Sequence, residues 1–124
     1  MTQRILVVED QEDLRAILRD FLTSAGYDIV EACDGIEGVA KARSARPDII
    51  LMDIQLPGLD GYEAIREIKA DPNHKSTPII AVSSFAMKGD EEKARASGCD
   101  SYVTKPYSPV KLLGLIRSFL GENA

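Results

Sequence analysis

Short apolar runs and longer amphipathic stretches alternate along this chain. Five runs rich in β-branched residues predict strands, and the segments between them carry apolar residues at helical spacing. The predicted strands cover residues 5–8, 28–31, 49–52, 79–82 and 102–103. Such alternation is typical of a parallel sheet, because each connection between parallel strands needs a crossover.

Three of these runs, at residues 5–8, 49–52 and 79–82, are apolar at every position. Strands that are covered on both faces have this pattern, so we expect these three in the middle of the sheet. Right-handed crossovers with helices on both faces then give an α/β fold, a three-layer α/β/α sandwich around a five-stranded parallel sheet. The flavodoxin-like strand order 2-1-3-4-5 is the leading candidate, although spacing alone does not fix it.

The first helix shows the clearest periodicity, and Gly26 is predicted to end it. We expect one buried apolar stripe on it, which comprises Leu14, Ile17, Leu18, Phe21, Leu22 and Ala25. Further helices are expected near residues 35–45, 60–70, 87–97 and 108–120, with Gly98 closing the fourth and Pro109 in the first turn of the fifth. The polar segment 71–78 predicts an exposed connection in which His74 is solvated.

Length and charge narrow the functional classes. A chain of 124 residues with 44% hydrophobic content suits a single domain over residues 1–124, without a separate output domain. Its net charge of -5 argues against direct binding to nucleic acid or to an acidic membrane. No apolar run approaches the roughly 20 residues that span a bilayer, so we expect a cytoplasmic protein. Cys33 and Cys99 are predicted to be free, buried thiols.

Polar residues follow the predicted strands where a functional crevice is expected. Glu9 and Asp10 follow the first strand, Asp53 the third, Ser83 the fourth and Lys105 the fifth. In open α/β sheets ligands bind at the carboxyl ends of the strands. Crowded carboxylates repel one another unless a cation lies between them, and oxygen ligands favour Mg²⁺, with Mn²⁺ as the alternative.

Each of these residues then has a predicted role. Asp53 ends the central strand and is the candidate nucleophile toward phosphorus, while Glu9 and Asp10 hold the metal together with Asp53. Ser83 donates a hydrogen bond to a phosphoryl oxygen, and Lys105 neutralises another. The backbone carbonyl of Gln55 could supply a further metal ligand. A single acid after a strand would be explained equally well by turn formation, so the prediction depends on the combination.

Three separated segments resemble the signature of receiver domains from two-component response regulators, the CheY-like family. They are residues 6–10 (LVVED), 51–61 (LMDIQLPGLDG) and 105–106 (KP). The resemblance runs through nearly the whole chain. Residues 84–92 and 97–102 further resemble single-domain regulators of the DivK type.

The resemblance implies a phosphoprotein rather than an enzyme with a separate substrate. It implies that a histidine kinase or histidine phosphotransfer protein donates a phosphoryl group to Asp53, that Glu9 and Asp10 help to bind Mg²⁺, and that Lys105 and Ser83 contact the acyl phosphate. Such a protein catalyses only its own phosphorylation and dephosphorylation. It also implies a cis peptide between Lys105 and Pro106.

The signal is expected to pass through a conformational switch. Phosphorylation adds roughly 1.5 to 2 negative charges, which can draw the Ser83 hydroxyl and its loop toward the site. The resemblance places Tyr102 on the edge strand, where it would rotate to fill the space that this movement leaves. A half-buried strand tyrosine with its hydroxyl in water is the alternative interpretation.

The last predicted helix has more apolar residues than one buried stripe requires. They are Val110, Leu112, Leu113, Leu115, Ile116, Phe119 and Leu120. An exposed apolar patch there would suit a downstream protein partner bound by the face of residues 87–120, or a homodimer. A broad core face explains the same residues equally well.

Three rival functions share parts of this pattern. Aspartate-nucleophile phosphatases of the haloacid dehalogenase type place a second acid two residues after the nucleophile, where this chain has Gln55. A flavodoxin-like flavin carrier cradles phosphate after the first strand, and the acidic residues 9–13 would repel it. A receiver domain cut from a hybrid kinase or larger regulator would share all of the chemistry and differ in output.

Overall fold

The computed structural model describes residues 2–84 and 89–121. Within these residues five strands alternate with five α-helices, and a short 3₁₀ helix precedes the fourth strand. The elements are β1 (Arg4–Val8), α1 (Glu12–Ser24), β2 (Asp28–Ala32), α2 (Gly35–Ala45), β3 (Ile49–Asp53), α3 (Gly61–Ala70), η1 (Pro72–His74), β4 (Ile79–Ser83), α4 (Asp90–Ser97), β5 (Ser101–Thr104) and α5 (Pro109–Leu120). All predicted strands and helices are present. The start predicted for α4, at residues 87 and 88, lies outside the described residues.

The strands form one parallel sheet in the order β2-β1-β3-β4-β5 over the described residues. The predicted order is confirmed, and β3 is the central strand with β1 and β4 beside it. Every residue of β3 and β4 is buried, as the uninterrupted apolar runs predicted. The carboxyl ends of all five strands therefore meet at one edge of the sheet.

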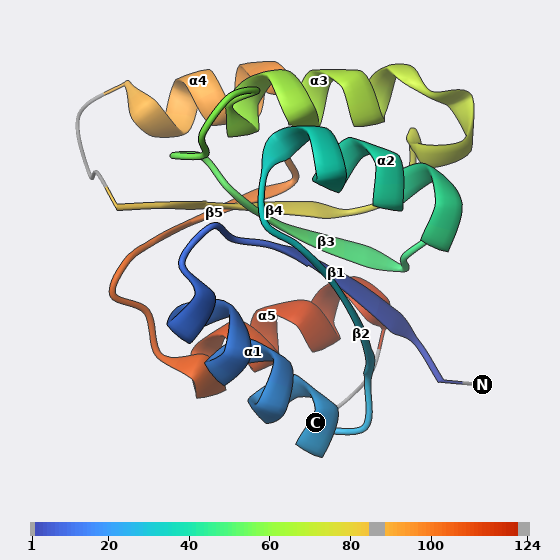
Figure 1. Ribbon diagram of the computed structural model, residues 1–124, viewed down its shortest axis with the longest axis vertical. Coiled ribbons are helices and arrows are strands. Elements are labelled where there is room, and N and C mark those ends of the chain that lie inside the picture. Colours follow the sequence, from blue (N-terminus) through green and yellow to red (C-terminus); the bar gives the residue numbers. More distant parts are fainter. Residues whose placement is uncertain (1, 85–88, 122–124) are drawn as a thin grey trace.

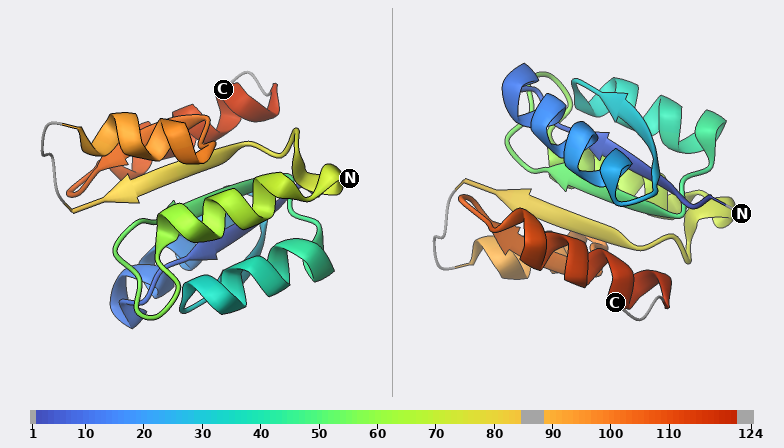
Figure 2. Two further views of the ribbon diagram at one scale, coloured as in Figure 1. Left: turned by 90° about the horizontal axis from the view of Figure 1, so that it is seen from above. Right: turned by 90° about the horizontal axis from the view of Figure 1, so that it is seen from below.

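Helices cover both faces of the sheet, which gives the predicted three layers (Figures 1 and 2). Helices α1 and α5 lie on one face, and α2, α3 and α4 lie on the other. Alternate residues of each strand supply the two cores: Ile5 and Val7 pack toward α1 and α5, whereas Leu6 and Val8 pack toward α2 and α3. No helix in the described ranges has the length and apolar character needed to cross a membrane.

Three expectations about burial are wrong. Ile17 is 58% exposed because the buried stripe of α1 is narrower than its apolar residues suggested, and Leu18 and Leu22 are its fully buried members. Cys33 is exposed, while Cys99 is buried as predicted. His74 is not solvated but 4% exposed, because η1 folds the connection back and its Nδ1 lies 3.3 Å from the Thr77 hydroxyl.

Most of the apolar residues of α5 belong to a broad core face. Leu112 and Ile116 are buried, and the partly buried residues that pack against the same core are Leu113, Leu115, Phe119 and Leu120. Val110 is 71% exposed. The surplus apolar residues of this helix are thus explained mainly by packing on the sheet.

The loop from β3 to α3 passes very close to the start of that helix. Asp60 caps α3 by accepting a hydrogen bond from the Glu63 amide at 3.0 Å, and the Gly61 amide donates to the Ile54 carbonyl at 3.1 Å. A Cβ at Gly61 would lie 2.6 Å from the Ile54 Cα and would also clash with the Asp53 carbonyl oxygen. Only glycine permits this approach, which fixes the backbone directly after Asp53.

We expect Gly61→Ala to lower the free energy of unfolding by about 1–3 kcal/mol, because the backbone around Asp53 must move to admit the methyl group. Gly114→Ala is the control, since Gly114 lies within α5 and a Cβ there meets nothing within 4 Å. That change should raise the free energy of unfolding by about 0.5–1 kcal/mol. Urea denaturation of both variants measures the difference. Equal effects would contradict the close approach at Gly61.

Candidate functional site

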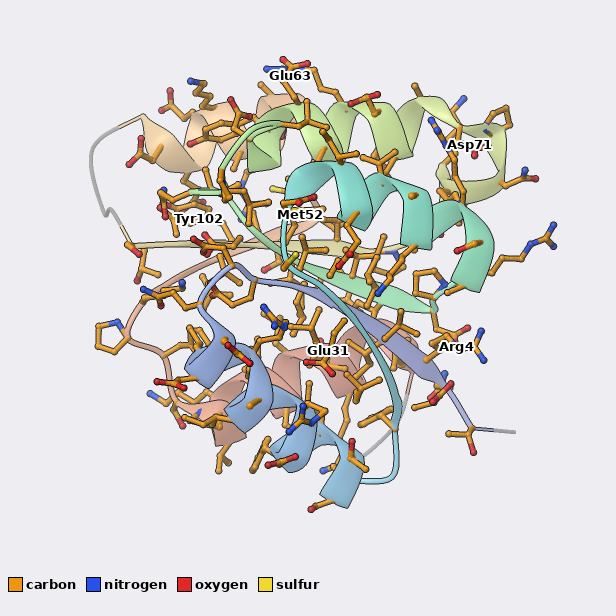
Figure 3. The ribbon with its side chains drawn as sticks, viewed as in Figure 1. Arg4, Glu31, Met52, Glu63, Asp71 and Tyr102 are labelled. Atoms are coloured by element: carbon orange, nitrogen blue, oxygen red, sulfur yellow. The ribbon has the colours of Figure 1, made fainter. Side chains whose placement is uncertain are left out.

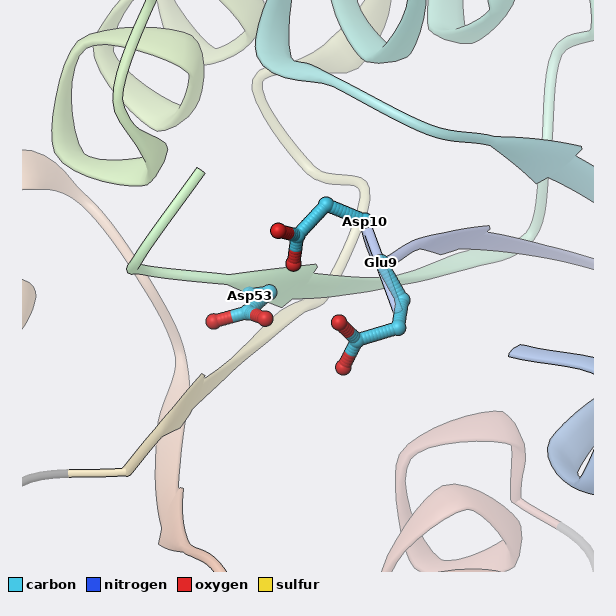
Figure 4. Close-up of side chains that lie close together, drawn as sticks. All are labelled: Glu9, Asp10 and Asp53. Atoms are coloured by element: carbon cyan, nitrogen blue, oxygen red, sulfur yellow. The ribbon is translucent and has the colours of Figure 1, made fainter. Parts of the chain in front are cut away.

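Three carboxylates meet at the carboxyl edge of the sheet. Glu9 and Asp10 directly follow β1, and Asp53 is the last residue of β3. One oxygen from each lies within 4.8 Å of the others, and the three side chains face a common space (Figure 4). Glu9 and Asp53 are each 3% exposed, whereas Asp10 is exposed. The structure therefore brings together the acids that the sequence singled out.

Lys105 reaches this cluster from the loop after β5. Its Nζ lies 2.7 Å from Glu9 Oε1 and 3.1 Å from Asp53 Oδ2. The peptide bond to Pro106 is cis, as predicted, and the Lys105 amide donates to the Ser83 carbonyl at 2.7 Å. One ammonium thus bridges two buried carboxylates from neighbouring strands.

Backbone amides hold the other oxygen of each buried carboxylate. The Gln11 amide donates to Glu9 Oε2 at 3.0 Å, and the Gln55 amide donates to Asp53 Oδ1 at 2.9 Å. Both oxygens of Glu9 and both of Asp53 therefore have a donor, so the orientations of these side chains are well determined.

A hydroxyl lies on the other side of Asp53. Ser83, the last residue of β4, is fully buried, and its Oγ accepts a hydrogen bond from Gln55 Nε2 at 3.0 Å. The Ser84 amide donates to Gln55 Oε1 at 2.8 Å. The sequence pointed to Gln55 for its backbone carbonyl and for its place two residues after Asp53, but it did not predict these side-chain contacts.

Tyr102 lies on β5, one strand beyond Ser83 (Figure 3). It is half-buried, and it packs against the core cluster that contains Tyr62 of α3 and Ala94 of α4. The site and the sheet edge that carries Tyr102 are therefore joined through β4.

The charges of the cluster are unbalanced. Three carboxylates face one ammonium, and the two negative charges that remain match one divalent cation. Partial burial, followed by the hydrogen bond and the negative charge of Glu9, raises the pKa of Asp10 above its ordinary value. An all-oxygen set of carboxylates is the donor set that hard cations such as Mg²⁺ prefer, so these residues fit a metal of that class.

Comparison with known proteins identifies the family of this chain. The family model for the response regulator receiver domain matches residues 5–117. The chain belongs to the receiver domain family. Two-component signal transduction is therefore its function, in the role of a response regulator receiver.

Several relatives of this receiver domain cover nearly its full length. The polar-differentiation response regulator DivK of Brucella ovis is 42% identical over 122 residues, which cover 98% of this chain and 99% of DivK. The receiver domain of the sensor histidine kinase PA1611 from Pseudomonas aeruginosa PAO1 is 38% identical with a TM-score of 0.90, covering 98% of this chain and 100% of that one. Its structure has a magnesium ion coordinated in the active site cleft.

A chemotaxis protein shows the same fold at lower identity. CheY4 of Vibrio cholerae is 28% identical with a TM-score of 0.91, covering 96% of this chain and 99% of CheY4. The receiver fold thus extends across relatives from differentiation, sensor-kinase and chemotaxis systems.

The Lys105 side chain is held in its charged form. Burial by itself would lower the pKa of Lys105, but the hydrogen bonds and negative charges of Glu9 and Asp53 outweigh burial, and the pKa is raised. Lys105 therefore stays protonated throughout the physiological pH range and keeps neutralising both carboxylates.

Two residues near the site were missed by sequence reasoning. Tyr107 follows Lys105 by two residues, and burial, together with the charges of Glu9 and Asp53, raises its pKa to about 12. Arg15, one turn into α1, donates from Nη1 to the Glu9 carbonyl at 2.7 Å and from Nε to Glu31 at 3.2 Å. The position of Arg15 soon after the acidic pair was the available signal, because a cation there can brace the acidic loop.

We expect Asp10→Asn to raise the free energy of unfolding by about 0.5–1 kcal/mol in metal-free protein at neutral pH. The pKa of Asp10 is raised on folding, so the ionised carboxylate destabilises the folded state at pH values above its ordinary pKa of 3.8. Thermal or urea unfolding with a chelator present measures the change.

Asp13→Asn removes the same charge from the first turn of α1, where a negative charge is favourable. It should lower stability by about 0.3–1 kcal/mol. A loss of stability in Asp10→Asn comparable to that in Asp13→Asn would show that the carboxylates at the sheet edge do not repel one another.

Proposed function

We propose that Asp53 accepts a phosphoryl group from a phosphohistidine of a histidine kinase or a histidine phosphotransfer protein. A divalent cation is held by Glu9, Asp10 and Asp53 and by the backbone carbonyl of Gln55, and Mg²⁺ is preferred to Mn²⁺ in this role. The observation that carries this proposal is the ammonium of Lys105, which bridges two buried carboxylates within a cluster of three acids.

Position favours Asp53 over the other two acids as the nucleophile. It ends the central strand, with Glu9 and Asp10 to one side and Ser83 to the other. Its two oxygens are oriented by the Gln55 amide and by Lys105. Donors surround Asp53 on both sides, so oxygens of a phosphoryl group placed there can be bound from several directions.

The transfer step needs no further acid or base from this chain. A carboxylate oxygen of Asp53 attacks phosphorus, the bond from phosphorus to the imidazole nitrogen breaks, and the bonding pair stays on that nitrogen, which takes a proton from solvent. Lys105 and the Ser83 hydroxyl stabilise the negative charge on the equatorial oxygens. When bound, Mg²⁺ supplies the remaining positive charge at these oxygens.

The signal leaves the site through Ser83 and Tyr102. A phosphoryl group on Asp53 attracts the Ser83 hydroxyl, and movement of the loop after β4 changes the space available to Tyr102 on β5. Contact between Tyr102 and the core beside α3 and α4 supports this route. Output then passes to a protein partner through the face of α4, β5 and α5, either downstream or in a second copy of this chain.

An apolar groove beside the site supports the approach of a protein phosphodonor. A cavity of about 350 Å³ lies between α1 and the loop after β5, with Lys105 in its wall. Leu14 and Ile17 line it from α1, and Pro106 lines it from the loop. The exposure of Ile17, unexpected for a core residue, suits a surface that a partner covers.

Phosphoryl uptake should require Asp53 and a divalent cation. We expect the intact mass of the wild-type chain to increase by one phosphoryl group after incubation with an acyl phosphate donor and Mg²⁺. Asp53→Asn should show no adduct, because an amide oxygen is a poor nucleophile toward phosphorus. A chelated wild-type sample should also stay unmodified.

Asp20→Asn serves as the matched control for this experiment, since its carboxylate lies exposed on α1 beside Arg19. It should take up phosphoryl at the wild-type rate. An adduct on Asp53→Asn would refute the assignment of the nucleophile.

Lys105→Met should slow phosphoryl uptake by about 10²–10³-fold, because it removes one preorganised positive charge from the transferring group. It should also lower the free energy of unfolding by about 3 kcal/mol, since two buried carboxylates lose their shared partner. Lys111→Met removes the same charge from the exposed face of α5 and should change neither quantity appreciably. Uptake is measured by mass at a temperature where circular dichroism shows both variants folded. A wild-type rate in Lys105→Met would exclude a role for this ammonium in the transfer.

A further inference from the structure

The side chain of Gln55 joins the two loops that flank the proposed phosphoryl position. It starts from the loop after β3, two residues beyond Asp53, and reaches the end of β4. Its Nε2 donates to Ser83 Oγ at 3.0 Å, and its Oε1 accepts from the Ser84 amide at 2.8 Å. Both ends of one amide group are therefore engaged by consecutive residues of the neighbouring strand end.

The chemistry of the partners fixes the orientation of this amide. A backbone N–H can only donate, so the group facing Ser84 must be the Gln55 oxygen. The nitrogen then faces Ser83, where it occupies an acceptor site of the hydroxyl. Ser83 is fully buried, so its position depends on the few groups that touch it.

These contacts involve groups that a phosphoryl group on Asp53 would need. The Ser83 hydroxyl must turn or move toward the phosphoryl oxygens in order to bind them. The Ser84 amide, at the start of the same loop, is a further donor whose bonding capacity Gln55 Oε1 already takes. A ligand shifts a conformational equilibrium only by contacts that differ between the two states, and these two hydrogen bonds are such contacts.

We propose that Gln55 is a positioning residue whose side-chain amide holds Ser83 and Ser84 in their unphosphorylated arrangement, so that a phosphoryl group must compete with it. This inference rests on the proposed function of Asp53. Gln55 acts through the residues it holds and not on phosphorus itself. It sets how much of the binding energy of the phosphoryl group goes into moving Ser83 and Ser84.

Gln55 can hold both serines only with its amide nitrogen and its amide oxygen, on a side chain of this length. Gln55→Met keeps a flexible side chain of similar length and removes donor and acceptor together. Gln55→Glu keeps an oxygen for the Ser84 amide and loses the donor to Ser83 Oγ, because a carboxylate can only accept there. The two variants therefore separate the contact with the Ser84 amide from the donation to Ser83 Oγ.

The first measurement uses the full chain without phosphodonor or metal, so it does not depend on phosphoryl chemistry. We expect the exchange rate of the Ser84 amide proton, followed by NMR, to rise roughly tenfold in Gln55→Met and to stay near the wild-type value in Gln55→Glu. The amide signals of Tyr102 should shift in Gln55→Met. An unchanged Ser84 exchange rate in Gln55→Met overturns the proposal.

The second measurement uses beryllofluoride with Mg²⁺ as a stable mimic of the phosphoryl group. Gln55→Met should bind it more tightly than wild type, by roughly tenfold, because two opposing hydrogen bonds are gone. In a Ser83→Ala background the same substitution should give a clearly smaller gain, because one of the two contacts is already absent. Binding that is unchanged or weaker in Gln55→Met overturns the proposal.

The two measurements test the role of Gln55 separately from the proposed function of Asp53. If wild type and variants alike fail to bind the mimic and Asp53 takes up no phosphoryl group, the proposed function fails. The contact made by Gln55 is then decided by the Ser84 exchange rate alone. A full set of dispersed amide signals in each variant shows that a loss of fold is not the cause of any change.

Discussion

The bridge from Lys105 to Glu9 and Asp53 is the interaction on which the rest of this site depends. A parallel sheet ends all of its strands at one edge, and here that edge places two buried carboxylates beside a third that is exposed. Without a cation their repulsion and their loss of hydration would oppose folding. The ammonium comes from a loop 96 residues away in sequence from Glu9, so it can neutralise these two carboxylates only when the sheet has formed.

The loops around this bridge hold their residues in fixed positions. Gly61 lets α3 begin against the backbone that follows Asp53, and Asp60 caps the same helix. On the opposite side Lys105 is anchored through its own amide to the Ser83 carbonyl. Glu9, Asp53 and Lys105 are thus held in place, and the Gln55 side chain links Ser83 and Ser84, at the end of β4, to the loop after β3. Movement of Ser83 and Ser84 on phosphorylation therefore requires these side-chain hydrogen bonds to change.

The sequence predicted the layers of this fold because consecutive apolar residues mark the buried strands. The spacing of apolar residues marks the buried faces of the helices. The strand order was only the leading candidate among those that right-handed crossovers allow, since no spacing rule distinguishes it. The acids and Lys105 were predictable because each directly follows a strand, and strand ends converge. The burial of His74, the exposure of Ile17 and the side-chain contacts of Gln55 were not, because each depends on which segment lies opposite in space. A polar residue in a loop has no periodicity from which its partner can be inferred.

The hydrogen bonds of the unphosphorylated site also explain why a small chemical change can carry a signal. The donors next to Asp53 that we describe, namely Lys105 and the Gln55 and Ser84 amides, already have acceptors. A phosphoryl group brings strong acceptor oxygens and roughly 1.5 to 2 further negative charges to these donors. Where one of them turns to a phosphoryl oxygen, it leaves the acceptor that it binds in the unphosphorylated site. Because Gln55 joins Ser83 and Ser84, loss of either contact loosens the other, and the change reaches two consecutive residues of the loop instead of one.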